Sequence, residues 1–153
     1  MACGDDERDM HLPKTASDDQ GFTLIELLVV ILIIGILAAI AIPAFLSQTG
    51  KANDSAAKTQ VGTLQTTIQA YAAEHNGSYE GGSLTELQKI EPTLKDTTTA
   101  TAAVLKVEPE VFEVASTAKG TGSVYKLKNE KGTITRTCTA GASKGACPAA
   151  GTW

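Results

Sequence analysis

The sequence has little of what most enzymes need. It contains no G-x-S-x-G, P-loop or dinucleotide-binding motif, and its two histidines, His11 and His75, are far apart. No C-x-x-C pair is present either, so we expect no catalytic residues, no metal site and no bound cofactor. Glu108 and Glu110 flank Pro109 and resemble calcium ligands, but a solvated turn explains them better.

The chain also has no excess of basic residues. Its 13 Lys and Arg are outnumbered by 17 Asp and Glu, which gives a net charge of −4. Residues 1–21 hold six acids and two bases, so the 132 residues that remain of the 153 are close to neutral. A protein that binds nucleic acid in bulk carries a basic stripe, and none is present. Aromatic residues make up only 5% of the chain, which gives little support for electron transfer along stacked rings.

What the chain does have is one long apolar run, residues 22–46. The 20 residues from Leu27 to Leu46 carry no charge. At about 1.5 Å per residue, a helix over 22–46 would span roughly 37 Å, enough to cross a hydrocarbon core of about 30 Å. We therefore expect this segment to enter a membrane. Glu26 is the one carboxylate inside it, and carboxylates in such positions are costly and usually functional.

The residues around Glu26 carry a specific pattern. The run GFTLIE at residues 21–26, followed by the apolar helix, resembles the prepilin signal of the type IV pilin and pseudopilin family. The resemblance implies that a membrane peptidase cuts after Gly21 and methylates Phe22. It also implies that Glu26 directs filament assembly by pairing with the freed amino group of Phe22 in a neighbouring subunit. Phe22 and Glu26 are i, i+4 neighbours, so the pair could also close within one chain.

Two residues interrupt the apolar helix, Gly35 and Pro43, and both fit the family pattern. Pro43 removes one backbone donor and crowds the preceding turn, so we expect it to kink or loosen the helix. The resemblance implies that the two residues make the helix flexible in an assembled fibre. A simple kink where the helix leaves the membrane is the alternative explanation.

Two ordinary explanations of the N-terminus compete with this interpretation. A secretory signal peptide cleaved after Ala41 would need a basic N-terminal region and a short apolar run, whereas here the leader is acidic and the run is long. A simple signal anchor would merely tolerate Glu26 near the interface. The leader departs from the family pattern, in which short leaders usually carry net positive charge. A translation start at Met10 would shorten it to 12 residues with fewer acids.

The pattern changes after residue 50. Apolar residues now recur at intervals of four and three, which indicates one apolar stripe on a helix. The stripe consists of Ala57, Val61, Leu64, Ile68 and Tyr71. The helix should stop near Asn76-Gly77, because glycine suits the left-handed position after a helix. The polar residues expected to face water are Lys51, Asp54, Lys58, Gln65 and Gln69.

A polar connection and a set of strands follow. The run SLTE at residues 83–86 predicts a capping box and a short helix that ends before Pro92. Segments rich in Val, Thr, Tyr, Phe and Ile then predict strands, at residues 104–107, 111–116, 123–128 and 133–138. Alternation gives the sheet one apolar face that can cover the helical stripe. The expected fold class is therefore α+β, with a long N-terminal helix packed against an antiparallel sheet of about four strands, as in a pilin.

The expected organisation has five parts. A leader is removed on processing, a membrane-spanning helix continues into an amphipathic outer half, and a connecting region leads to the sheet and C-terminal loop. These parts cover residues 1–21, 22–46, 47–76, 77–103 and 104–153.

Cys138 and Cys147 bracket a loop of Gly, Ala, Ser and Lys. An exported domain lies in an oxidising compartment, so we expect a disulfide between them. Closing about ten residues contributes roughly 2–3 kcal/mol in the chain-entropy model. Pilins commonly close a C-terminal loop in this way. Cys3 lies in the leader and needs no partner.

The sequence therefore predicts a structural subunit rather than an enzyme. The resemblance implies a type IV pilus subunit for adhesion, twitching motility or DNA uptake, held in the inner (cytoplasmic) membrane and then polymerised into an extracellular filament. Its expected partners are copies of itself, the lipid bilayer, the prepilin peptidase/methyltransferase and the inner-membrane assembly platform. The alternatives are a pseudopilin of a type II secretion system and a minor pilin that captures DNA or a surface. Such capture has no support beyond five lysines: Lys119, Lys126, Lys128, Lys131 and Lys144.

Overall fold

The computed structural model describes residues 21–143 and 145–153 of the chain. They belong to two compact units, one ending at Ala38 and the other covering Ala39–Trp153. The predictions that concern residues 1–20, including a start at Met10 and an unpartnered Cys3, lie outside the described residues, as does Lys144.

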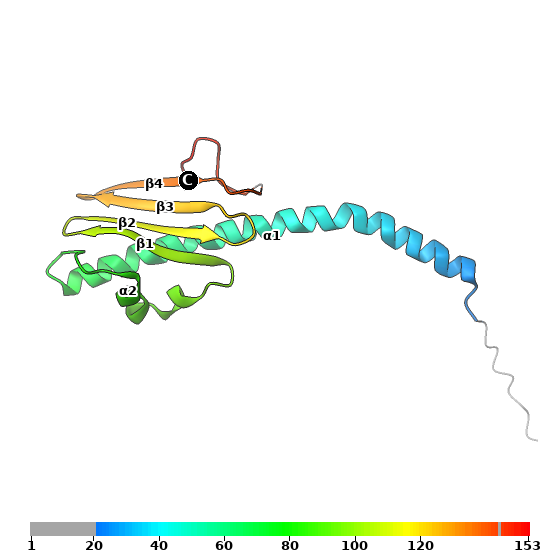
Figure 1. Cartoon of the computed structure of the whole chain (residues 1–153), viewed down its shortest axis with the longest axis horizontal. Helices are drawn as coiled ribbons and strands as arrows, with labels where there is room; N and C mark the ends of the chain where they lie inside the picture. Colours follow the sequence, from blue (N-terminus) through cyan, green and yellow to red (C-terminus); the bar gives the residue numbers. More distant parts are fainter. Residues whose placement is uncertain (1–20, 144) are drawn as a thin grey trace, which may run out of the picture. The chain divides into compact units, whose positions relative to one another are not determined.

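One long helix, α1, runs from Leu24 to Glu74 and includes Pro43 (Figure 1). It terminates close to the predicted stop, where Asn76 and Gly77 have φ angles of 54° and 83°. The Gly77 amide donates to the carbonyl of Ala72 at 2.8 Å, so the last turn keeps a partner for its carbonyl. The division of α1 into a spanning half and an outer half at residue 46 stays a prediction.

Four antiparallel strands follow in the order β1-β2-β3-β4. They are β1 (Ala100–Glu108), β2 (Val111–Ala118), β3 (Val124–Glu130) and β4 (Thr133–Thr139). The α+β fold class is therefore confirmed (Figure 1). Strand β1 begins four residues before the predicted start at residue 104. Ala100 and Ala102 are buried there, but these small residues in a threonine-rich run gave no apolar signal.

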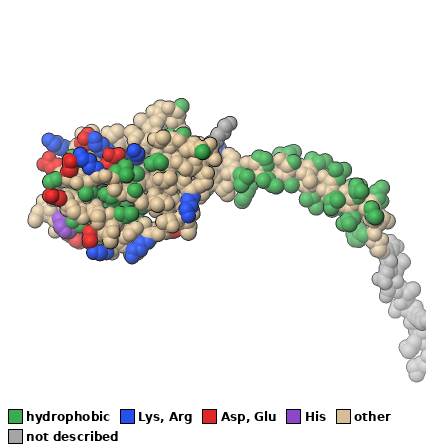
Figure 2. Space-filling model, in the orientation of Figure 1, with side chains coloured by type: hydrophobic (Ala, Val, Ile, Leu, Met, Phe, Trp, Pro, Cys, Tyr) green, Lys and Arg blue, Asp and Glu red, His purple; other side chains and the backbone are tan. Residues whose placement is uncertain are grey.

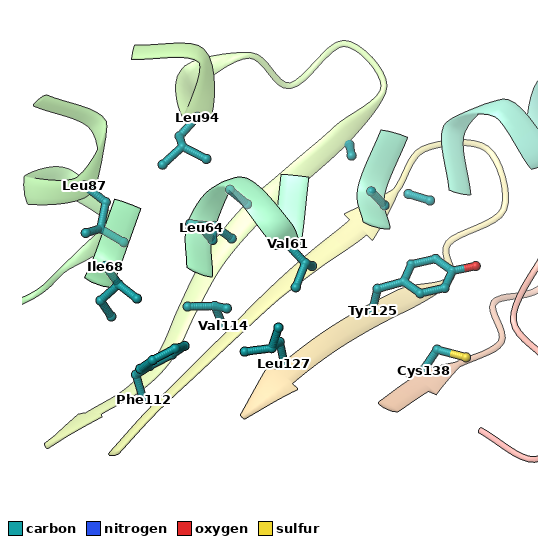
Figure 3. Close-up of a cluster of buried hydrophobic side chains, with 14 of the residues drawn as sticks. Val61, Leu64, Ile68, Leu87, Leu94, Phe112, Val114, Tyr125, Leu127 and Cys138 are labelled. Carbon is teal, nitrogen blue, oxygen red and sulfur yellow. The ribbon is translucent and has the colours of Figure 1, made fainter. Parts of the chain in front are cut away.

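The core of the second unit lies between α1 and one face of the sheet (Figure 3). Phe112, Val114 and Leu127 come from the strands and are fully buried. The predicted helical stripe supplies the opposite side, and its five residues all belong to this core cluster. Helix α2 (Leu84–Ile90) and the 3-10 helix η1 (Pro92–Lys95) add one buried leucine each, Leu87 and Leu94.

Only half of the predicted capping box at α2 forms. The Ser83 hydroxyl accepts a hydrogen bond from the Glu86 amide at 3.4 Å, as an N-cap should. The Glu86 carboxylate does not return to the Ser83 amide, which donates to the Gly81 carbonyl instead. Glu86 binds the ammonium group of Lys89 at 2.7 Å, one turn further along the helix.

The expectation that Asp54 faces water is wrong. Its side chain is 0% exposed. Asp54 lies three residues before Ala57 and so extends the apolar stripe by one position toward the N-terminus. A carboxylate at such a position needs hydrogen-bond donors around it.

The two C-terminal cysteines, Cys138 and Cys147, form a disulfide, with their Cα atoms 5.9 Å apart. The chain end folds back on β4, where Trp153 donates from its indole nitrogen to the Thr137 carbonyl at 2.9 Å. The indole also meets Tyr125 edge to face, with ring centroids 5.7 Å apart. The C-terminal tail is thus fixed to the sheet by a covalent bond, a hydrogen bond and an aromatic contact.

Candidate functional site

The apolar run of α1 is uncovered. From Phe22 to Leu46, the exposed fraction of its large apolar side chains ranges from 44% at Val29 to 87% at Phe22 (Figure 2). The helix is long and apolar enough to cross a membrane, and none of its most apolar window is buried. Water is a poor environment for such a surface. The segment therefore needs lipid or other apolar helices around it.

Glu26 is held at the start of this helix by Thr23. The carboxylate of Glu26 accepts from the Thr23 amide at 2.8 Å and from the Thr23 hydroxyl at 2.7 Å. In return, the Glu26 amide donates to the Thr23 hydroxyl at 3.3 Å. This reciprocal arrangement is a capping box, which satisfies two amides that the helix itself leaves without partners.

Thr23 is a residue that the sequence analysis did not single out. The signal was present, because Thr-x-x-Glu before an apolar run predicts a capping box. The expected partner of Glu26 was instead the α-amino group of Phe22. That group exists only after the bond to Gly21 is cut, and in the uncut chain the Phe22 nitrogen is a peptide amide. Until then, Thr23 gives the carboxylate a partner within its own chain.

The structure places Gly21, Phe22 and Glu26 at the same end of the helix. Gly35 lies in the helix interior, where a Cβ atom would meet nothing within 4 Å. Pro43 lies further along and belongs to the second unit. Cleavage and methylation at Gly21 and Phe22, assembly through Glu26, and flexibility at Gly35 and Pro43 remain predictions.

Residues 17–42 match a family model described as the prokaryotic N-terminal methylation motif. The chain carries the N-terminal signal of the type IV pilin family. It is 48% identical over 65 residues to the type IV major pilin protein PilA of Myxococcus xanthus. The aligned residues cover 42% of this chain and 30% of that protein. It is 46% identical over 55 residues to a fimbrial protein of Pseudomonas aeruginosa, 36% of each chain.

A further similarity is to the competence protein ComGC of Halalkalibacterium halodurans, 38% identical over 65 residues, 42% of this chain and 64% of that protein. The chain spans about a third of the length of the pilin and fimbrial relatives given above, at 30% and 36%. The similarity supports the N-terminal signal, and the pilin fold rests on the structure itself.

Four of the lysines considered for DNA or surface capture are among the described residues, and two of these, Lys126 and Lys128, lie on β3. Lys119 precedes β3 and Lys131 follows it, at opposite ends of the strand. Lys128 binds the carboxylate of Glu130 at 2.6 Å. The possible calcium ligand Glu108 binds the Lys106 ammonium group at 2.8 Å. Within residues 21–143 and 145–153 there is no group of three or more His, Cys, Asp or Glu that could hold a metal ion.

One titratable group in the second unit, the Tyr125 hydroxyl, has a strongly shifted pKa. Burial of Tyr125, together with the nearby Asp54 carboxylate, raises the pKa of the Tyr125 hydroxyl from 10.0 to about 12. Burial disfavours the charged phenolate, and a neighbouring negative charge disfavours it further. Tyr125 is fully buried against α1, so this phenol belongs to the core and not to a reactive site.

Proposed function

We propose that this pilin-type chain is a structural subunit of a type IV pilus. The precursor is held in the inner membrane by the apolar part of α1, and after processing the same helix packs against copies of itself in an extracellular filament. The folded unit Ala39–Trp153 then supplies the surface of the filament. Adhesion, twitching motility and DNA uptake are the roles that such a filament serves.

This proposal rests on the uncovered apolar surface of α1. A single anchor also needs lipid contact, but it needs neither the methylation motif over residues 17–42 nor a carboxylate inside its apolar run. A helix that moves from lipid into a bundle of identical helices needs a group that recognises a neighbour. Glu26 is the one charged side chain available for this between residues 22 and 46.

The pairing follows from the chemistry of the cut chain. Cleavage after Gly21 leaves a positively charged amine on Phe22, and methylation keeps that charge. In a fibre core without water, an unpaired charge costs several kcal/mol, so the amine and the Glu26 carboxylate each need an opposite charge. Glu26 of an incoming subunit meeting the Phe22 amine of its neighbour satisfies both and fixes the axial register. The carboxylate then exchanges Thr23 for this partner.

The first test is substitution of Glu26. Glu26→Ala should leave membrane insertion and cleavage after Gly21 intact and abolish filaments, and Glu26→Gln should do the same because it keeps the shape but loses the charge. Glu74→Ala, which removes an exposed carboxylate from the other end of the same helix, is the matched control and should give wild-type filaments. Processed subunit in the membrane is compared with filament sheared from the cells. Normal filament yield from Glu26→Ala would overturn the assembly role.

The second test concerns processing by the prepilin peptidase/methyltransferase. Mass spectrometry of assembled protein should find N-methylated Phe22 as the first residue. A mature terminus at Ile42 would instead establish an ordinary signal peptide, cleaved after Ala41.

A second candidate is favoured by the similarity to a competence protein, of which this chain covers 64%. In this alternative the subunit forms a short pseudopilus, for DNA uptake or secretion, assembled by the same inner-membrane platform and the same Glu26 chemistry. Electron microscopy of sheared surface material separates the two. Long filaments labelled by antibody to this chain support the pilus, and their absence despite correct processing supports the pseudopilus.

A further inference from the structure

The loop between Cys138 and Cys147 is held by groups from other parts of the fold. After Thr139, which ends β4, its described residues form no helix or strand. The Gly141 amide donates to the Ser123 hydroxyl at 3.4 Å, and the Ser143 amide donates to the Thr121 carbonyl at 3.4 Å. Both partners lie in the turn between β2 and β3. Residues 141 and 143 of the loop are therefore docked through their backbone amides.

The buried carboxylate of Asp54 on α1 binds both the loop and the turn between β2 and β3. One carboxylate oxygen accepts from the Thr121 hydroxyl at 2.5 Å, and the other accepts from the amide of Ala146. Lys58, one turn further along the helix, places its ammonium nitrogen 3.5 Å from the carbonyl oxygen of Ala146. Both polar backbone groups of Ala146 are thus bound by a pair of helix residues four positions apart.

The carboxylate is costly in this position. Burying a charge has a desolvation cost that its hydrogen bonds offset only when their geometry is good. Stability alone therefore gives little reason to keep an aspartate at the end of an apolar stripe. Specific placement of the groups that it binds is a better reason.

The loop sequence fits this docking closely. A Cβ atom on Gly145 would overlap the Asp54 carboxylate and the Ser123 hydroxyl. A Cβ atom on Gly141 would overlap the Thr121 carbonyl. Glycine is required at both positions so that the loop backbone can reach its partners.

We propose that Asp54, assisted by Lys58, is a positioning residue for formation of the disulfide. Cys138 is fixed independently of the loop, because it lies in β4 and pairs with Tyr125 of β3. Cys147 lies in a loop without secondary structure and is the residue directly after Ala146. Binding of Ala146 to the helix holds the Cys147 thiol near Cys138 before any covalent bond exists. This raises the effective concentration of one thiol around the other.

The reaction is thiol–disulfide exchange with a small-molecule disulfide such as oxidised glutathione. The thiolate of one cysteine attacks a glutathione sulfur, which forms a mixed disulfide and releases one glutathione thiolate. The second cysteine attacks the protein sulfur of the mixed disulfide and releases the second glutathione. The two protons lost by the cysteines are balanced by the two that the glutathione thiolates take up. Asp54 takes no part in the electron transfer and acts only through the position of Cys147.

The test is the equilibrium between the reduced and oxidised full-length chain in detergent, set by a glutathione redox buffer and measured by alkylation of the free thiols. Losing one hydrogen bond to a charged group corresponds to about a 10–100-fold change in an equilibrium constant. We therefore expect Asp54→Ala to lower the equilibrium constant for oxidation of the two cysteines by glutathione disulfide, called the oxidation constant below, at least tenfold. Asp54→Asn should fall between Asp54→Ala and the wild type, because an amide can still accept from Ala146 and donate to the Thr121 hydroxyl.

Two controls separate positioning from general destabilisation. Asp96→Asn alters an exposed carboxylate that binds Thr98 in its own turn and should leave the constant unchanged. Val61→Ala weakens the core without touching the loop and should also leave it unchanged, provided that the reduced chain is folded by circular dichroism. If reduced Asp54→Ala does not fold, Asp54→Asn carries the test. A wild-type constant in the folded Asp54 variants, or an equal fall in Val61→Ala, would overturn the proposal. The readout does not depend on filament formation, so it is independent of the proposed function.

Discussion

Thr23 and Glu26 can be separated by substitution, because the two residues are coupled in the uncut chain but are expected to act differently in a filament. Thr23→Ala removes the hydroxyl that donates to the Glu26 carboxylate at 2.7 Å and accepts from the Glu26 amide at 3.3 Å. The backbone amide of Thr23, which binds the same carboxylate at 2.8 Å, remains in the variant. The perturbation therefore weakens the cap and leaves the carboxylate in place.

The expected magnitudes differ by more than an order of magnitude. Replacing an N-cap threonine by alanine typically costs about 1 kcal/mol, which is roughly a fivefold change in an equilibrium. Removing one partner of a buried charge pair costs about 3–5 kcal/mol, which is a factor of more than one hundred. Thr23→Ala should thus reduce filament yield a few-fold at most. Glu26→Ala should remove filaments altogether.

The assay is a quantitative immunoblot of sheared filament against processed subunit in the membrane. Thr23→Ser keeps the hydroxyl and should match the wild type. If Thr23→Ala abolishes filaments as completely as Glu26→Ala, the capping box itself is what assembly requires. An intermolecular pair between Glu26 and the Phe22 amine would then be unnecessary, and the proposed role of the Glu26 charge would be refuted.

Three further predictions concern the folded unit and are measured by unfolding of the full-length chain in detergent. Leu64 is fully buried between α1 and the sheet, so Leu64→Ala should lower the free energy of unfolding by about 3–5 kcal/mol. Gln69→Ala, on the exposed side of the helix, is the control and should change it by less than about 0.5 kcal/mol. Equal effects of the two substitutions would contradict this packing. Cys138→Ser should lower the free energy of unfolding by roughly 3 kcal/mol, from the chain-entropy cost of a ten-residue loop, and reductant should then have no further effect on the variant. The folded state keeps the Tyr125 proton up to a pKa of about 12, against 10.0 for the ordinary phenol, so the free energy of unfolding should fall as pH rises through this window, by up to about 3 kcal/mol. Tyr125→Phe should remove that part of the pH dependence, and an unchanged profile would show that this phenol does not cause it.

The sequence predicted most of the architecture because periodic patterns decide it. The spacing of four and three residues after residue 50 identified the helical face that packs on the sheet, and alternation identified three of the four strands to within two residues. Asp54 was misplaced although it fits the same spacing, three residues before Ala57. The prediction placed Asp54 in water because its side chain is charged, although its position in the apolar pattern indicated burial. Only the donors on Thr121 and Ala146, which are 67 and 92 residues away, make the buried carboxylate acceptable.

Two other misses have local causes. The start of β1 was placed late because Ala100 and Ala102 are small and lie in a threonine-rich run, where pairing with β2 decides the strand and residue type does not. Thr23 was overlooked because the carboxylate three residues later already had an assembly role implied by the family resemblance. The same Thr-x-x-Glu motif can cap a helix and also supply the carboxylate proposed to pair with a neighbouring subunit, so the motif alone does not separate the two roles.

The uncovered surface of α1 has a consequence for the direction of assembly. Between residues 22 and 46 the helix can leave lipid only for other apolar helices, and lipid tails are as apolar as leucine side chains. The hydrophobic effect therefore contributes nearly the same free energy on both sides of the exchange. In the proposed filament, the remaining free-energy difference comes from close packing and from the proposed pair between Glu26 and the Phe22 amine, each contributing a few kcal/mol. If the proposed filament is built on this balance, we expect a modest external input to let it grow or return its subunits to the membrane, and the loss of the Glu26 carboxylate to shift the balance.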